Sequence, residues 1–120
     1  MIAGGSPTVY VSDMDAAVQF YTGVLGLQLE FRAGDHWASV NAGAGLRIGL
    51  HPAGEHTPPP GTRGAITIGL LVDEPIDTVV ARLTERGVPF AGPVRAERML
   101  KLAFFHDPDG NELYLAEPAR

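Results

Sequence analysis

The chain has 120 residues and a mass of 12.7 kDa, which suits one domain with a single hydrophobic core. Hydrophobic residues make up 45% of it and charged residues 19%, a composition typical of folded globular proteins rather than disordered ones. Cysteine is absent, which excludes disulfides and cysteine-based metal sites, and the net charge of −5 with scattered basic residues argues against a nucleic-acid partner.

Membrane insertion and secretion are not indicated either. No apolar run approaches the roughly 20 residues of a membrane-spanning helix, and the first residues lack the basic and apolar parts of a signal peptide. We therefore expect a cytoplasmic protein without a membrane partner.

The first half of the sequence predicts one strand, one helix and three more strands. Residues 9–11 form a short apolar strand, and Ser12 or Asp13 follows as the cap of a helix that ends near Gly26. Three further strand-like runs, separated by turns that contain glycine, occupy residues 27–32, 37–42 and 46–51.

The second half repeats this order of elements. A strand at 66–72 leads to a helix that Asp73 and Pro75 start and Gly87 ends. Apolar residues at i, i+3, i+4 and i+7 predict one buried face on that helix, made of Ile76, Val79, Val80 and Leu83. Three strands are again expected, at residues 88–91, 99–106 and 111–116.

The repetition predicts an α+β fold of two tandem βαβββ modules, about residues 6–51 and 65–117. The segment 52–64, PAGEHTPPPGTRG, is rich in proline and glycine and joins the modules as an irregular linker. We expect the strands to form a curved, cup-like mixed sheet with the helices on its convex face.

Alternation along the strands separates a wholly apolar face, which buries against the helices, from a mixed face. The mixed face carries aromatic, polar and small residues: Tyr10, Trp37, Ser39, Arg47, Gly49, His51, Thr67, Gly69, Glu112 and Tyr114. Such a face is either solvent-exposed surface or the wall of a ligand pocket, and the aromatic residues beside glycines favour the pocket. The run 99–106 is apolar on both faces, so alternation does not orient it.

Two motifs carry a resemblance that covers nearly the whole chain. The first is Val11-Ser12-Asp13-Met14 with Phe20-Tyr21 and Val24-Leu25-Gly26-Leu27, and the second is Asp107-Pro108-Asp109-Gly110-Asn111. The chain resembles the glyoxalase, bleomycin-resistance and extradiol-dioxygenase group, the vicinal oxygen chelate superfamily. This resemblance is specific for the fold and weak for function, because the fold hosts lyases, epimerases, oxygenases, thiol transferases and drug-binding proteins.

The resemblance also locates four metal-ligand positions on the concave face, which metal-using members fill with His, Gln or Glu. Here they are Ser6, Gly49, Thr67 and Tyr114, none of which is a usual ligand for a transition metal. His51 and Glu112 lie near two of these positions, but two donors fall short of the three or four that a tight site needs. We therefore predict no metal and no cofactor.

The predicted function is metal-independent binding and sequestration of a small aromatic compound, as in bleomycin-resistance proteins that confer antibiotic resistance. The predicted ligand-binding residues are Tyr10, Trp37, Ser39, Arg47, His51, Thr67 and Tyr114, with Trp37 and Tyr114 stacking on the ligand. The resemblance implies a homodimer whose concave faces pair to form two clefts. The sequence leaves open an enzyme, a lyase, isomerase or dioxygenase-like protein that is metal-free or has a displaced metal site, and a regulatory domain that lost the chemistry.

Overall fold

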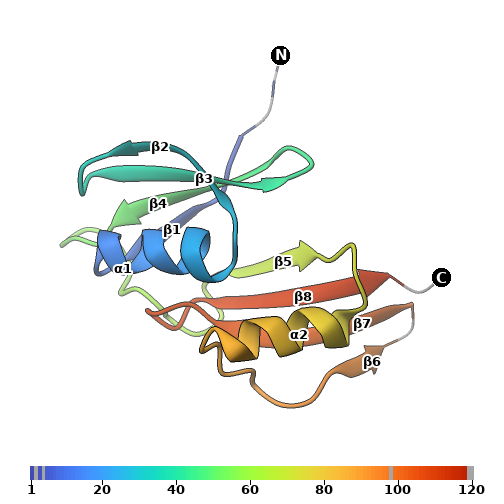
Figure 1. Cartoon of the computed structure of the whole chain (residues 1–120). Coiled ribbons are helices and arrows are strands. Elements are labelled where there is room, and N and C mark those ends of the chain that lie inside the picture. Colours follow the sequence, from blue (N-terminus) through green and yellow to red (C-terminus); the bar gives the residue numbers. More distant parts are fainter. Residues whose placement is uncertain (2, 4, 98, 119–120) are drawn as a thin grey trace.

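The computed structural model describes residues 1, 3, 5–97 and 99–118 and contains two four-stranded sheets, each with one helical segment (Figure 1). Sheet A has the strand order β1-β4-β3-β2 and sheet B the order β5-β8-β7-β6. The α+β class and the two tandem modules are confirmed. In the part of the chain that the structure describes, no helix is long and apolar enough to cross a membrane.

In the first module, β1 (Thr8–Val11) pairs in parallel with β4 (Leu46–Pro52), and β3 (Trp37–Gly43) pairs antiparallel with both β4 and β2 (Gln28–Ala33). The helix α1 (Met14–Val18) begins at Asp13, whose side chain accepts a hydrogen bond from the Ala16 amide, as the sequence predicts.

The second part of the predicted helix is not α-helical. The helix continues as a π-helical segment, η1 (Gln19–Val24), in which the Leu25 amide donates to the carbonyl of Phe20. The Thr22 hydroxyl donates to the Val18 carbonyl at 2.6 Å, which occupies an acceptor of the preceding turn. The chain then leaves the helix at Gly26, whose φ of 78° favours glycine.

In the second module, β5 (Thr67–Leu71) pairs in parallel with β8 (Glu112–Pro118), and β7 (Leu100–His106) pairs antiparallel with β8. The helix α2 (Ile76–Glu85) is not capped by Asp73, contrary to the prediction. Its first amide, that of Ile76, instead donates to the carboxylate of Glu117, which lies 41 residues later on β8.

The strand predicted at 88–91 is wrong. Pro89 has no amide hydrogen to donate to a ladder, Val88 is buried in the core, and Ala91 makes a single hydrogen bond to Phe104. The strand that pairs with β7 is β6 (Arg95–Glu97), which comes after Pro93.

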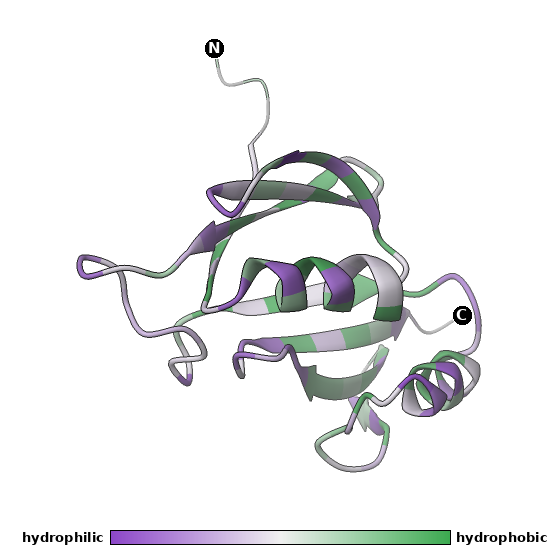
Figure 2. Cartoon of the chain, turned by 60° about the vertical axis from the view of Figure 1, so that its left-hand side comes forward, coloured by the Kyte–Doolittle hydropathy of each residue, from purple (hydrophilic) through white to green (hydrophobic). Residues whose placement is uncertain are grey.

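The core lies on the helix sides of the two sheets. Most side chains expected on the apolar faces of β1, β3, β4 and β8 are buried there, whereas Ala42 and Leu46 at the β3–β4 end are only partly buried. Strand β7 contributes Ala103 and Phe105 to the core. Both helices show hydrophobic and hydrophilic bands in Figure 2, as expected for helices with one buried side. The opposite, helix-free faces of the sheets carry the mixed residues.

The Asp-Pro-Asp-Gly-Asn turn of the second module packs against β1 and η1 of the first module and holds the two modules together. The buried carboxylate of Asp107 accepts hydrogen bonds from the Tyr21 hydroxyl at 3.0 Å and from the side chain and amide of Asn111. Burial, and then the charge of Asp107, raise the pKa of Tyr21 well above its ordinary value. Asp109 accepts from Ser12, so this turn also fixes the start of the first helix.

Candidate functional site

The helix-free face of sheet A brings together five of the predicted ligand-binding residues. Alternation along the paired strands places Tyr10, Trp37, Ser39, Arg47 and His51 on this side of the sheet. The indole of Trp37 lies against Gly49 of the neighbouring strand, so closely that a Cβ at position 49 would overlap the ring. Glycine at this position therefore leaves the space that the tryptophan ring occupies on the sheet.

His51 lies between two aromatic rings on this face. Its ring contacts Tyr10 edge-on at a centroid distance of 5.7 Å and Trp37 at 6.3 Å. The Nδ1 atom is 2.8 Å from the carbonyl of Pro52, and because a carbonyl only accepts, Nδ1 carries the proton. In the neutral ring, Nε2 is then a hydrogen-bond acceptor.

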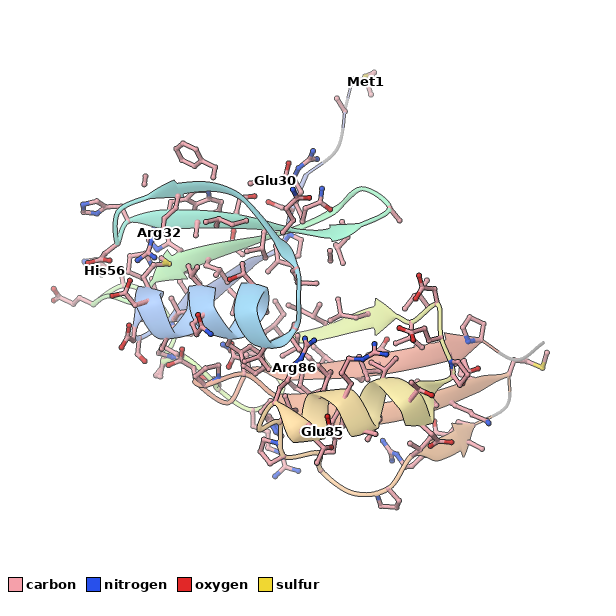
Figure 3. All side chains as sticks on the ribbon, viewed as in Figure 1. Met1, Glu30, Arg32, His56, Glu85 and Arg86 are labelled. Atoms are coloured by element: carbon pink, nitrogen blue, oxygen red, sulfur yellow. The ribbon has the colours of Figure 1, made fainter. Side chains whose placement is uncertain are left out.

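Arg47 on this face is paired with a carboxylate. Its Nε atom lies 2.7 Å from the Glu30 carboxylate, which comes from an irregular position of β2. Glu30 and Arg32 lie on opposite sides of sheet A, since Arg32 pairs with Asp15 on the helix side (Figure 3). The helix-free face of sheet A, called face A below, is therefore aromatic, and the charge of its Arg47 is balanced by Glu30.

The helix-free face of sheet B, called face B below, also carries an aromatic ring packed against a glycine. The ring of Tyr114 lies against Gly69, its partner across the β5–β8 pair, where a Cβ would overlap the tyrosine. Phe104 packs beside Tyr114 at a centroid distance of 5.3 Å, and the guanidinium of Arg95 lies 4.6 Å from the centre of the Phe104 ring. Two positions earlier in the same pair of strands, the Thr67 hydroxyl donates to the Glu112 carboxylate at 2.9 Å.

Phe104 and Arg95 lie beside Tyr114 as candidate site residues, and the sequence did not predict them. Strand 99–106 is apolar on both faces, so its pattern does not show that Phe104 joins Tyr114 while Phe105 enters the core. Arg95 belongs to a strand that the sequence places elsewhere. Only the pairing of β7 with β8, which places Phe104 opposite Tyr114, shows on which face of the sheet Phe104 lies.

The two aromatic faces belong to separate sheets. In Figure 1 the helix-free face of sheet A points upward, while α2 covers the near side of sheet B and its helix-free face points away from the viewer. Within the described ranges, no hydrogen bond or ring contact joins the two groups of predicted residues. The structure thus gathers Tyr10, Trp37, Ser39, Arg47 and His51 on one face and Thr67 and Tyr114 on the other.

A cleft of about 590 Å³ lies between the modules and contains neither Trp37 nor Tyr114. Apolar side chains from the end of η1, the β3–β4 turn, β5 and α2 line most of it, with Arg82 and Arg86 at its rim. Arg86 donates to the carbonyl of Val24, and Arg82 pairs with Glu74, whose pKa this arginine lowers. The β3–β4 turn lies at one side of the cleft and contributes Ala42, Ala44 and Leu46 to its lining.

Comparison with known proteins decides the family. The model of the glyoxalase/bleomycin resistance protein/dioxygenase superfamily matches residues 5–115. The chain belongs to this superfamily. No protein with a curated description matches the chain.

Solved structures of the superfamily are similar over nearly the whole chain. An antibiotic-binding protein, TnmS3 from Streptomyces sp. CB03234, is 32% identical with a TM-score of 0.82, over 99% of this chain and 98% of that one. A superfamily member from Sphaerobacter thermophilus DSM 20745 is 30% identical with a TM-score of 0.81, over 98% of both chains. A glyoxalase/bleomycin resistance protein, also from Streptomyces sp. CB03234, is 33% identical with a TM-score of 0.75, over 94% and 98%.

The residues at the superfamily's metal positions do not fit a metal ion. Gly49 offers no side chain and is covered by the Trp37 ring, while Tyr114 lies over Gly69. Ser6 and Thr67 supply only neutral hydroxyls, and that of Thr67 donates to Glu112. Among the residues that the structure describes, no three His, Asp or Glu side chains are grouped to hold a metal.

Proposed function

We propose that this protein binds and sequesters a small, planar aromatic compound without a metal ion, using the helix-free faces of its sheets. One observation carries the proposal: each face holds a large aromatic ring in close contact with a glycine, Trp37 on Gly49 and Tyr114 on Gly69. A ring held in this way keeps one face available for stacking, and the sheet fixes its orientation before the ligand arrives.

The polar groups around the rings suit recognition. His51 presents Nε2 as an acceptor beside Tyr10 and Trp37, and Ser39 lies on the next strand. A few placed polar groups among aromatic walls are typical of small-molecule sites. The similarity to an antibiotic-binding protein at 32% identity supports a binding role.

The complete site, in this proposal, is a cleft between two copies of the chain, with face A of one copy opposite face B of the other. Support comes from large apolar side chains that stay exposed on these faces. Phe31 on face A is 58% exposed and Leu71 on face B is 77% exposed. A second copy would bury them, and twofold pairing would produce two equal clefts.

Trp37 is the single tryptophan of the chain, so its fluorescence reports directly on the proposed site. We expect planar aromatic compounds, including polycyclic antibiotics, to quench this emission in a saturable way. Trp37→Phe retains a stacking ring, so it should retain binding, measured by calorimetry. Trp37→Ala should weaken binding about tenfold or more, the equivalent of a lost aromatic contact.

Two results would contradict the proposal. One is the absence of saturable binding across a broad set of planar aromatic compounds. The other is a stoichiometric transition metal that survives dialysis in protein purified without a metal-affinity tag and is lost in a His51→Ala variant.

A further inference from the structure

Glu112 is an acidic residue on face B, in the same strand as Tyr114. Both residues belong to β8 and point to the same side, two positions apart, which places their Cα atoms about 7 Å from each other. The Glu112 side chain is half-buried, and Thr67 donates to its Oε1 atom at 2.9 Å. This hydrogen bond fixes the direction of the carboxylate.

Among the residues that the structure describes, the carboxylate has no cationic partner. None of the ion pairs within the described ranges includes Glu112, and His106, which lies opposite it on β7, is not within ion-pair distance. Face A differs in this respect, because Glu30 there is neutralised by Arg47 at 2.7 Å. An ionised carboxylate accepts up to about four hydrogen bonds, so Glu112 retains capacity for a ligand.

The charges on face B also give it a direction. Arg95 on β6 lies over Phe104 on β7, so it is on the side of Tyr114 away from β5. Glu112 is at the start of β8, next to the Asp-Pro-Asp-Gly turn. A ligand ring on Tyr114 therefore has a cationic group on one side and a carboxylate on another. A positively charged substituent is repelled from Arg95 and attracted to Glu112.

We infer that the aromatic ligand carries a basic nitrogen, a protonated amine, and that Glu112 binds it while Tyr114 stacks on the ring. This inference rests on the proposed function and adds the chemical class of the ligand. Thr67 acts as a positioning residue, since it touches the carboxylate rather than the ligand.

The test uses matched pairs of probes on the whole protein: naphthylethylamine and anthrylethylamine, which are ammonium ions at neutral pH, and the corresponding neutral alcohols. Affinities are measured by calorimetry for the unmodified chain and for Glu112→Gln, which keeps the shape and removes the charge. We expect the amines to bind more tightly than the alcohols, and Glu112→Gln to weaken amine binding about tenfold while leaving alcohol binding unchanged.

Glu85→Gln is the control for long-range electrostatics. It makes the same change in net charge on α2, which lies on the other side of sheet B (Figure 3), and should leave all affinities unchanged. Thr67→Val should weaken amine binding by a smaller factor than Glu112→Gln.

The outcomes separate the two proposals. If amines and alcohols bind equally, or if Glu112→Gln weakens both alike, the role of Glu112 is overturned while the aromatic site stands. If neither kind of probe binds, the proposed function fails and this inference fails with it.

Discussion

At the scale of single residues, two glycines determine what the aromatic side chains present. Gly49 and Gly69 both have ordinary negative-φ backbones, so an alanine at either position meets no backbone strain. The obstacle is the ring above, Trp37 in one case and Tyr114 in the other. Glycine is therefore needed at these positions for the close approach of a side chain rather than for its conformational freedom.

Gly49→Ala tests this conclusion. The added methyl group should displace the Trp37 ring from the sheet and weaken binding of planar aromatic compounds roughly tenfold, as expected for a lost stacking contact. Stability should change by less than about 1.5 kcal/mol, since the ring moves toward solvent. Calorimetric titration and thermal unfolding measure the two effects.

Ser39→Ala provides a comparison on the same face, because it removes a hydroxyl and leaves the ring in place. An unchanged affinity in Gly49→Ala, together with a changed Trp37 emission spectrum, would show that the ring moves and that its position on the sheet is irrelevant to binding.

Tyr21 gives a prediction about stability and pH. Its hydroxyl donates to the buried Asp107 carboxylate, so Tyr21→Phe should lower the free energy of unfolding by about 1.5–3 kcal/mol at neutral pH. The pKa of Tyr21 is raised above its ordinary 10.0 in the folded chain. Above that pH the unfolded chain loses this proton while the folded chain keeps it, so stability falls as pH rises, by up to about 1.4 kcal/mol per unit.

Urea unfolding at a series of pH values from neutral to strongly alkaline measures this linkage. The contribution of the Tyr21 proton is complete below pH 10.0 and declines above it, and the difference between Tyr21→Phe and the unmodified chain should shrink over that range. Tyr114→Phe is the control with a tyrosine outside the core. A constant difference across the alkaline range would contradict the assignment.

Alternation of apolar and polar residues predicted which face of the sheet most strand residues occupy, but not all of them. Period-two alternation correctly separated Val9, Val40 and Leu113 from Tyr10, Trp37 and Tyr114, because one face of each strand is wholly apolar. It failed for Phe104 and Phe105, which are chemically alike and differ only in which sheet face their register gives them. Pairing across strands is a tertiary property, and no local pattern records it.

At the scale of elements, local signals predicted where helices begin and end better than how they are capped. Asp13 caps α1 because its side chain reaches its own helix, a contact within three residues. The amide of Ile76 at the start of α2 is instead bound by Glu117, which only the folded sheet brings near. Strand β6 was missed for a similar reason, since its pairing with β7 is a contact that local propensity does not describe.

The start of α2 supplies the element-scale prediction. Glu117→Ala should destabilise the chain by about 1 kcal/mol, because the Ile76 amide loses its acceptor. Asp73→Ala should cost less, since no hydrogen bond of the described residues involves the Asp73 side chain. Chemical unfolding of both variants measures the difference, and a larger loss for Asp73→Ala would favour the cap that the sequence predicted.

At the scale of the whole molecule, the asymmetric joining of the modules decides what one chain can build. The Asp-Pro-Asp-Gly-Asn turn locks the second module onto η1 through Asp107 and Tyr21, while the corresponding turn of the first module leaves a cleft of about 590 Å³. The resulting arrangement points the two aromatic faces in different directions (Figure 1). Under the proposed function, one chain therefore offers two half-sites rather than an enclosed pocket.

If the half-sites are joined by a second copy, two defective variants should complement each other. A Trp37→Ala chain keeps an intact face B, and a Tyr114→Ala chain keeps an intact face A. In a mixed dimer, the intact faces meet in one cleft and the two altered faces meet in the other. We expect each variant alone to bind planar aromatic compounds about tenfold more weakly, and the mixed dimer, isolated with two different tags, to regain one site of full affinity. Light scattering should give the mass of two 12.7 kDa chains for all three proteins. A mixed dimer that binds as weakly as its parents would place both faces of the site within one chain, because only a site shared between copies can be restored by mixing.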